Sequence, residues 1–345
     1  MLLLFNASVS LVMGTFIALT STHWLTAWMG LEMSTMAIVP LLTNKHHPRM
    51  TEAATKYFLA QALASCTLMA GCTSAAIIEG HWVLQNVSTP IPTAIITLAL
   101  AMKLGMAPLH AWMPEVIQGV DLNKTLILAT WQKLAPFGLF VQITHSSPLL
   151  IMSLAIMSML VGGWGGLNQT QLRKILMYSS IAHMGWMTVV MQFSPTLAFM
   201  TFVTYCLMSA AAILVLQINS ILTINLLATS WTKTPAFLVL IPLILLSLAG
   251  IPPFSGFLPK WMIVKELATQ GYLTLAGLAV MTALLTLFFY VRLILSVVMG
   301  SSPSPTLHSC PWRFDPKYWP LPRSLTVVTA LILLPVASLI IAVFC

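Results

Sequence analysis

Long apolar runs separated by short polar segments set the pattern of this chain. A transmembrane helix needs about 20 mostly apolar residues, and its backbone must satisfy its own hydrogen bonds inside lipid. By that measure we predict eleven helices and therefore an all-α polytopic membrane protein. The predicted helices are residues 2–20, 23–43, 56–78, 91–114, 122–143, 148–167, 171–191, 196–219, 235–268, 272–299 and 324–343.

The composition agrees with this pattern and excludes several classes of protein. The chain has 345 residues, of which 59% are hydrophobic and 6% are charged, whereas soluble domains carry roughly 25% charged residues. This composition excludes a cytosolic enzyme, a disordered chain and a nucleic-acid binder, and it favours a chain surrounded by a phospholipid bilayer. The five cysteines form neither a CxxC pair nor a Cys/His metal spacing, so we expect no metal site.

Lysine and arginine are distributed unevenly between the two sets of predicted loops. One set holds eleven of these residues, the opposite set holds only Lys265, and three lysines fall inside apolar segments. Because such an asymmetry orients membrane proteins, we expect the N-terminus on the basic side and the C-terminus on the other. The basic loops and the helix ends beside them hold Lys45, Arg49, Lys56, Lys124, Arg173, Lys174, Lys233, Arg292, Arg313, Lys317 and Arg323.

Four ionisable residues lie inside predicted membrane helices: Glu32, Lys103, Lys133 and Lys260. The first three are roughly 14–18 Å from the nearer helix end at about 1.5 Å per residue, which is too deep for a lysine to reach the surface easily. A central charge is unfavourable by at least ~2.5–3.5 kcal/mol on insertion scales. These groups therefore need partners, water or a reason to titrate.

Two explanations of these charges differ in what they imply. A structural ion pair would let Glu32 neutralise one lysine, but one carboxylate facing three lysines leaves two of them unexplained. The other explanation is coupling, since two unit charges about 7 Å apart at an effective dielectric of about 20 interact by roughly 2.4 kcal/mol. Movement of Glu32 toward or away from a lysine would then change the proton affinity of that lysine by a factor on the order of tens. Proton translocation requires a change of this kind.

Two predicted helices are interrupted, and each interruption lies beside an intramembrane lysine. KLGMAPLHAWMPE (103–115) and GIPPFSGFLPK (250–260) place prolines in apolar runs, where proline breaks the helical hydrogen-bond ladder. Paired interruptions in two halves of a chain point to a transporter site. The alternative is that proline and glycine are simply common in membrane helices.

The positions of the interruptions predict a repeat. They fall in the fourth and ninth predicted helices, and this odd offset of five inverts the second unit relative to the first. We therefore expect inverted five-helix repeats over residues 1–143 and 144–300, followed by a polar loop and a C-terminal helix over residues 301–345.

Two histidines are further candidates for a proton relay. His110 follows the first interruption, and His183 lies in the middle of a predicted helix, on one face with Ser179 and Ser180. Histidine titrates near neutral pH, so it suits proton transfer. A lone helical histidine is nevertheless more often a hydrogen-bonded core residue.

Five segments of the chain resemble the family of mitochondrial NADH–ubiquinone oxidoreductase chain 2. This family supplies a membrane subunit of respiratory complex I and is related to cation/proton antiporter subunits. The third and fourth segments resemble chain 2 rather than its paralogues, chains 4 and 5. The segments are TEAATKYFLAQ (51–61), LAMKLGMAPLHAWMPEV (100–116), TWQKLAP (130–136), GGWGGLNQTQLRKILMYSSIAHMGWM (162–187) and GIPPFSGFLPKW (250–261).

The resemblance implies roles for individual residues. Glu32 looks like the glutamate that pairs with the lysine of the first broken helix, here Lys103. Lys133 looks like the central connecting lysine of a hydrophilic axis, and Lys260 like the ionisable residue at its end. His110 and His183 fall where the family places histidines near that axis.

The resemblance also implies a function, a location and partners. The chain would be a proton-translocating core subunit of H+-translocating NADH:ubiquinone reductase, with no redox chemistry of its own. It would lie in the mitochondrial inner membrane with its basic side and N-terminus toward the matrix, beside other membrane subunits that include chains 4 and 4L. NADH, FMN, the iron–sulfur clusters and ubiquinone would belong to partner subunits, and this chain would bind no cofactor.

Two other functions stay open from the residues. One is an Mrp-like sodium/proton antiporter subunit, which would use the same buried charges and broken helices. The other is a non-enzymatic scaffold, in which the buried charges specify only how the helices pack.

Overall fold

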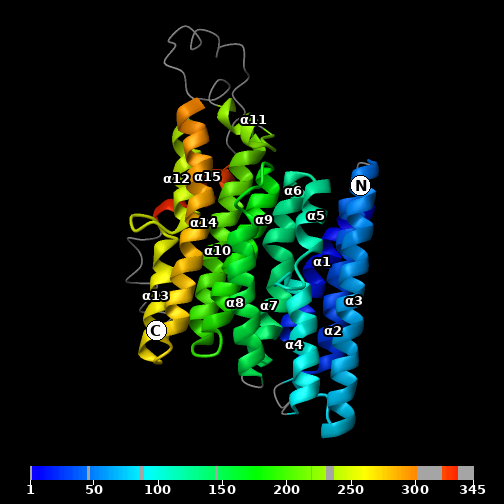
Figure 1. Cartoon of the computed structure of the whole chain (residues 1–345). Helices are drawn as coiled ribbons and strands as arrows, with labels where there is room; N and C mark the ends of the chain where they lie inside the picture. The colour runs from blue at the N-terminus through cyan, green and yellow to red at the C-terminus, as the bar shows by residue number, and fades with distance from the viewer. Residues whose placement is uncertain are drawn as a thin grey trace. The chain divides into compact units, whose positions relative to one another are not determined.

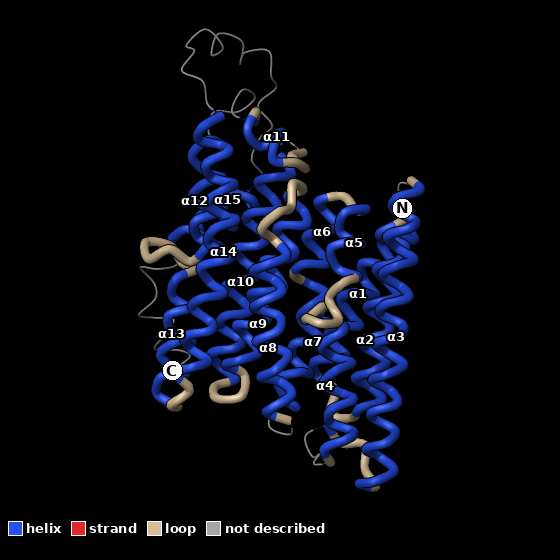
Figure 2. Tube along the Cα trace, in the orientation of Figure 1, coloured by secondary structure: helices blue, strands red, loops and turns tan. Residues whose placement is uncertain are grey.

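The structure is a computed structural model that describes residues 2–44, 47–84, 89–143, 147–218, 220–230, 237–300 and 321–332. Within these residues the chain forms fifteen α-helices and no strand. Figure 2 shows these helices in blue, joined by tan loops and turns. The chain divides into two compact units, Met1–Ser158 and Met159–Cys345.

The described part of the first unit contains seven helices and the beginning of an eighth (Figure 1). The eighth helix, α8 (Pro148–Gly165), ends in the second unit. The other seven are α1 (Leu2–Thr20), α2 (Trp24–Leu42), α3 (Pro48–Glu79), α4 (Pro90–Leu104), α5 (Trp112–Gly119), α6 (Leu122–Ala129) and α7 (Trp131–Ile143).

The second unit continues from the end of α8. Its described helices are α9 (Leu172–Val190), α10 (Pro195–Ile218), α11 (Ile224–Ala228), α12 (Phe237–Ala249), α13 (Phe257–Thr269), α14 (Leu273–Gly300) and α15 (Leu321–Ile332).

Helix length and surface chemistry identify a multi-pass membrane protein. Six helices of the described residues are long and apolar enough to cross a membrane, with α6 and α7 counted as one span, and three more are apolar but shorter. Large apolar side chains such as Phe5, Leu149 and Trp164 are exposed. Lipid tails tolerate such a surface, whereas water does not.

Most predicted helix boundaries agree closely with the structure. Six helices begin and end within two residues of the prediction, namely α1, α2, α8, α9, α10 and α14. Both predicted interruptions are also present, because residues 105–111 separate α4 from α5 and residues 250–256 separate α12 from α13.

One predicted helix was wrong in its extent, and another has the predicted outer bounds but is divided. The helix predicted over residues 56–78 begins at Pro48, because proline suits the first helical position and the His47 ring accepts a hydrogen bond from the Arg49 N–H. The helix predicted over residues 122–143 divides at Thr130. The short helix α11 was not predicted. Residues 301–320, with most of the predicted polar loop, and residues 333–343 of the last predicted helix lie outside the described residues.

A short backbone bridge occurs once in each unit. His23, just before α2, pairs antiparallel with Val83, which follows α3, and Gln171, just before α9, pairs with Thr223, which follows α10. In both bridges two backbone hydrogen bonds flank the paired residues. The donor is the N–H of the residue that follows one paired residue, and the acceptor is the carbonyl of the residue that precedes its partner. These bonds are Trp24 to Trp82 (3.0 Å), Leu84 to Thr22 (3.2 Å), Leu172 to Leu222 (3.0 Å) and Ile224 to Thr170 (3.2 Å).

Glycine allows two further helix pairs to approach closely. A Cβ added to Gly14 of α1 would lie 2.8 Å from the backbone nitrogen of Ser34 in α2. A Cβ added to Gly162 of α8 would lie 2.5 Å from the backbone nitrogen of Ala182 in α9. Small residues at such points let helix backbones touch, which is how membrane helices pack without a hydrophobic driving force.

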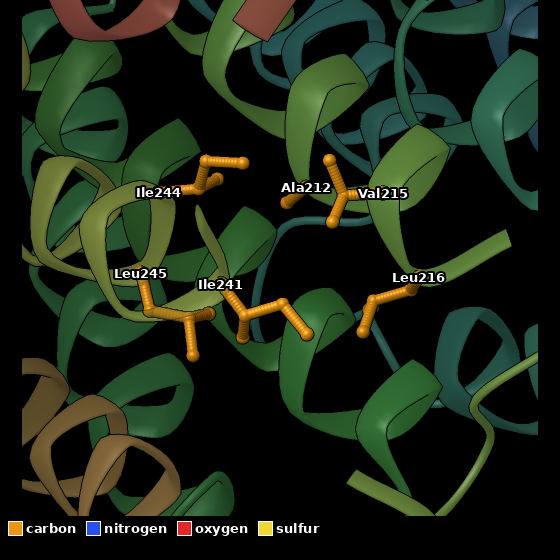
Figure 3. Close-up of a pocket in the computed structure, with 6 residues that line it drawn as sticks. All are labelled: Ala212, Val215, Leu216, Ile241, Ile244 and Leu245. Atoms are coloured by element: carbon orange, nitrogen blue, oxygen red, sulfur yellow. The ribbon is translucent and has the colours of Figure 1, made fainter. Parts of the chain in front are cut away.

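An apolar pocket lies between α10 and α12, which pack against each other in the second unit. Figure 3 shows Ile241, Ile244 and Leu245 on one side of it, and its other lining residues are Ala212, Val215 and Leu216. The lining has no polar side chain that could carry a proton, so proton chemistry must be sought elsewhere.

Candidate functional site

Glu32 lies half-buried on α2, and two hydroxyl groups hold its carboxylate. The Ser65 hydroxyl on α3 donates to Oε1 over 2.7 Å, and the Thr35 hydroxyl donates to Oε2 over 2.8 Å. Each hydroxyl also has a backbone carbonyl within reach, at Ala62 and at Glu32 itself. Because a hydroxyl has one proton, each can bond either to the carboxylate or to the carbonyl.

Lys103 lies in the last turn of α4 and is 3% exposed. Its ammonium nitrogen is buried and has no hydrogen-bond partner among the described residues. The Glu32 carboxylate is within electrostatic range of it, but the two side chains make no direct ion pair in the described structure. The carbonyl groups at the C-terminal end of α4 also favour a cation at this position.

The first interruption begins immediately after Lys103. Gly105 ends α4 with a φ of 73°, a left-handed conformation that favours glycine. Across the gap, the indole nitrogen of Trp112 in α5 donates to the Met102 carbonyl over 3.1 Å. His110 lies in the gap, half-buried, with a ring nitrogen 3.3 Å from the Pro108 carbonyl. The gap therefore keeps a fixed shape beside the lysine.

Lys133 lies in the first turn of α7 and is 2% exposed. Its helix packs against both α2 and α4, the helices of Glu32 and Lys103. The neighbouring side chain of Gln132 donates from Nε2 to the Tyr57 hydroxyl on α3 over 3.0 Å. The first unit therefore gathers three of the predicted ionisable residues on helices that contact one another.

Lys260 lies in the second unit, just after the other interruption. Its ammonium group donates to the Ala249 carbonyl at the end of α12 over 2.7 Å. Gly250, with a φ of 80°, lies directly beneath the lysine stem, since a Cβ there would be 2.9 Å from Lys260 Cδ. The lysine thus satisfies a carbonyl that the broken helix leaves without an intrahelical partner.

A small cavity with a partly polar lining brings together two residues that are far apart in the sequence. His183 and Lys260 both line it, as do Thr201 and Tyr205 of α10. The His183 and Tyr205 rings lie 5.5 Å apart. The cavity has a volume of about 10 Å³, which is room for about one water molecule.

Three residues of these sites were missed by the sequence analysis. Ser65 holds Glu32, Tyr57 joins Gln132, and Tyr205 lines the cavity of the second unit. A signal for the first two was present, because Tyr57 and Ser65 are eight residues apart and therefore share one face of a predicted membrane helix. No group of three His, Cys, Asp or Glu side chains among the described residues could hold a metal ion.

Comparison with protein-family models matches nearly the whole chain. The model described as NADH:quinone oxidoreductase/Mrp antiporter, TM, covers residues 21–286, and the model described as NADH dehydrogenase subunit 2 C-terminus covers residues 287–341.

Curated relatives cover the chain just as fully. NADH-ubiquinone oxidoreductase chain 2 of Tetraodon nigroviridis is 49% identical over 97% of this chain and 96% of its own. The protein of the same name from Oncorhynchus mykiss is 50% identical over 96% of both chains.

Solved structures show the same fold. A chain of respiratory complex I from Thermus thermophilus superposes with a TM-score of 0.83 at 27% identity, covering 98% of this chain and 78% of that one. A chain of the Mrp complex from Dietzia gives a TM-score of 0.78 at 19% identity, covering 87% of this chain and 61% of that one, which bears on the fold alone.

Proposed function

Because the chain belongs to the family of NADH-ubiquinone oxidoreductase chain 2, we propose that it moves protons as a membrane subunit of respiratory complex I. Electron transfer from NADH to ubiquinone takes place in partner subunits, which carry FMN and the iron–sulfur clusters. This chain contributes titratable side chains rather than redox groups, and it assembles with other membrane subunits.

Glu32 and Lys103 form the switching pair in this proposal. The observation that carries it is a carboxylate within electrostatic range of a buried ammonium group that has no hydrogen-bond partner in the described structure. When Glu32 gains a proton, the negative charge that favours protonated Lys103 disappears, and Lys103 releases its proton more readily. When Glu32 is ionised again, Lys103 takes up a proton.

Lys133 is the relay that receives protons from this pair. It is buried on α7, the helix that packs against the helices of both Glu32 and Lys103. Charge on Lys133 disfavours charge on Lys103, because two like charges in a low-dielectric interior repel. Protonation therefore alternates between Lys133 and Lys103. His110, which lies between α4 and α5, exchanges protons with groups outside this pair.

Lys260 and His183 form the exchange site of the second unit. They line one cavity with room for about one water molecule. A water molecule there would pass a proton between the lysine and the imidazole, whose proton affinity near neutral pH suits both directions of transfer.

Two inverted five-helix repeats, over residues 1–143 and 144–300, organise these sites. The matching backbone bridges support this part of the proposal, since His23 and Gln171 are 148 residues apart. The close contacts of Gly14 with Ser34 and of Gly162 with Ala182 are related by the same 148 residues. One register along two helix pairs is the expected result of an internal duplication.

The orientation follows from the basic loops. We infer that the N-terminus lies with the basic loops on the matrix side of the mitochondrial inner membrane, where positive charge gathers, and that with eleven spans the C-terminus lies on the other side. In the first unit, Lys124 donates to the Leu42 carbonyl at the end of α2, and Lys56 pairs with Glu52 and Glu115, each over 2.9 Å. These contacts support a common basic end for α2, α3 and α5. Lys45, Lys233, Arg313 and Lys317 of the predicted basic loops lie outside the described residues.

The intact complex carrying Lys103→Met tests this function. Methionine keeps most of the length of the side chain and removes its charge. We expect assembled complex that oxidises NADH but moves fewer protons per NADH. A normal proton-to-electron ratio in assembled Lys103→Met complex would show that the switching pair does not drive translocation.

An Mrp-like sodium/proton antiporter is the second candidate function, because the matching family model includes Mrp antiporter subunits. The two are distinguished by the purified chain in liposomes. Sodium-driven proton exchange by the chain alone would favour the antiporter, whereas the proposed subunit shows none outside its complex.

A further inference from the structure

A row of polar side chains runs along the buried face of α3. Tyr57, Gln61 and Ser65 are four residues apart, so they lie above one another on one side of the helix. Their exposed fractions are 0%, 3% and 2%. We call these three residues the α3 polar stripe. The rest of the buried face of α3 consists mainly of small and apolar side chains.

The stripe connects groups that the proposed function uses. At one end, Ser65 donates to the Glu32 carboxylate over 2.7 Å. At the other end, the Tyr57 hydroxyl accepts a bond from Gln132, the neighbour of Lys133. The Tyr57 ring also packs edge-on against Trp112, which closes the break beyond Lys103, with ring centroids 5.9 Å apart.

Two buried amide atoms, one in the stripe and one beside it, have no hydrogen-bond partner in the described structure. These are Nε2 of Gln61 and Oε1 of Gln132. A buried polar atom without a hydrogen bond costs about 1–3 kcal/mol, and in natural proteins such atoms are usually satisfied by water. Successive stripe residues are also about 6 Å apart along the helix axis. The hydrogen bonds of Ser65 and Tyr57 in the described structure go to other residues and not along the stripe, and one water molecule can bridge two neighbouring polar side chains.

The second unit supports the same interpretation. Val83 and Thr223 of the backbone bridges are 140 residues apart, and the helices before them end alike, at Gly80 and Ser220 with positive φ. In this register Gln61 corresponds to Thr201 and Ser65 to Tyr205. Both of these residues line the cavity that has room for about one water molecule.

We propose that the α3 polar stripe holds a short file of water molecules and is the pathway along which protons reach Glu32. This inference rests on the proposed function, because it gives Glu32 its proton supply. Gln61 is a positioning residue that holds a water molecule and transfers no proton itself. Tyr57 and Ser65 take part through their hydroxyl groups.

The transfer of a proton to Glu32 conserves protons and bonds at each step and needs no electron donor or acceptor. A protonated water beside Gln61 gives its proton to Ser65 Oγ while the Ser65 hydroxyl proton moves to Glu32 Oε1. One O–H bond breaks and one forms at each step, and the net change is one proton gained by Glu32. Rotation of the Ser65 hydroxyl toward the Ala62 carbonyl, 2.8 Å away, lets the chain reset.

The test compares three variants in the intact complex reconstituted in liposomes, with Glu32→Gln measured in parallel. Gln61→Leu removes the amide at similar volume. Tyr57→Phe removes only a hydroxyl and keeps the ring against Trp112, so it decides the question if Gln61→Leu fails to assemble. Thr67→Val is the matched control, because Thr67 lies on the exposed face of α3 and bonds only to carbonyls of its own helix.

We expect Gln61→Leu and Tyr57→Phe to slow proton uptake by about tenfold, equivalent to about 1.4 kcal/mol in the barrier, while Thr67→Val behaves as the unmodified complex. The loss of proton-uptake rate should grow as pH rises, because the supply of protons then limits the rate. A purely structural defect would show no such trend. Normal uptake in assembled Gln61→Leu and Tyr57→Phe together with a loss in Glu32→Gln would overturn the stripe alone. Normal pumping in Glu32→Gln would overturn the proposed function itself.

Discussion

Ser65 on α3 donates a hydrogen bond of 2.7 Å to the Glu32 carboxylate on α2. The two residues are 33 positions apart in the chain, so the contact exists only because the two helices pack against each other. It gives the half-buried carboxylate a donor that is not a lysine. The ionised form of Glu32 is therefore stabilised without a fixed ion pair, and Lys103 stays able to respond to its charge.

Ser65→Ala removes this donor and keeps the fold of α3. A hydrogen bond to a charged group is worth about 1.5–3 kcal/mol, so its loss should change the environment of the carboxylate. Infrared difference spectra of the intact complex should show a shift of the Glu32 carboxylate stretching band. An unchanged band position would mean that Ser65 does not hold the carboxylate.

Lys260→Met should reduce the number of protons moved per NADH while electron transfer continues in uncoupled membranes, because the cavity of the second unit loses its amine. Lys265→Met is the control on the same helix, since Lys265 is exposed. Proton release is measured with a pH-sensitive dye in reconstituted vesicles. Equal ratios for the two variants would remove Lys260 from the pathway.

Gly250→Ala should displace Lys260. Gly250 has a φ of 80°, and an added Cβ would lie 2.9 Å from Lys260 Cδ. Gly271→Ala is the matched control, since Gly271 has a φ of 82° with nothing within 4 Å. Both variants bear the backbone strain of about 1–2 kcal/mol for a left-handed alanine.

The expected result is a similar modest loss of thermal stability in both glycine variants, with reduced proton translocation in Gly250→Ala alone. Thermal inactivation of the complex and its proton-to-electron ratio are the two measurements. If Gly271→Ala lowered the ratio as much as Gly250→Ala, backbone strain rather than lysine displacement would be the cause.

Gly162→Ala should impair assembly, because the added methyl would lie 2.5 Å from the backbone nitrogen of Ala182. Gly14→Ala should do the same at the corresponding contact of the first unit, 2.8 Å from the Ser34 nitrogen. Gly277→Ala is the control, since a Cβ there meets nothing within 4 Å. The amount of assembled complex on native gels reports the outcome, and normal assembly of both Gly162→Ala and Gly14→Ala would contradict the packing argument.

Both helix breaks could be predicted from the sequence, because they depend on residues whose backbone chemistry is local. Pro108 and Pro252 cannot continue a helical ladder, and Gly105 and Gly250 adopt positive φ. The buried lysines could also be found, since a charge inside an apolar run is visible without coordinates.

The division of the fifth predicted helix could not be found in this way. The run from Leu122 to Ile143 is long and mainly apolar, and Pro136, the residue that most disfavours a helix, lies inside α7 without ending it. The break falls instead at Thr130, where the sequence has neither proline nor glycine to mark it. From the sequence, Lys133 is therefore expected deep within one helix, whereas it lies in the first turn of α7.

Contacts between helices were beyond sequence reasoning as well. Nothing in the spacing of Ser65 and Glu32 shows that α2 and α3 meet there, and nothing near His183 shows that Lys260 lines the same cavity. Such pairs depend on helix rotation and close approach, which are set by small residues such as Gly14 and Gly162 on neighbouring helices.

In the proposed mechanism the charge of Glu32 controls proton movement, and the proton-to-electron ratio of intact complex carrying Glu32→Gln measures that control. Glu115→Gln is the control, because that carboxylate is exposed and pairs only with Lys56 in the described structure. We predict that Glu32→Gln assembles and oxidises NADH but moves fewer protons per NADH, while Glu115→Gln keeps the normal ratio. A normal ratio in Glu32→Gln would contradict the account.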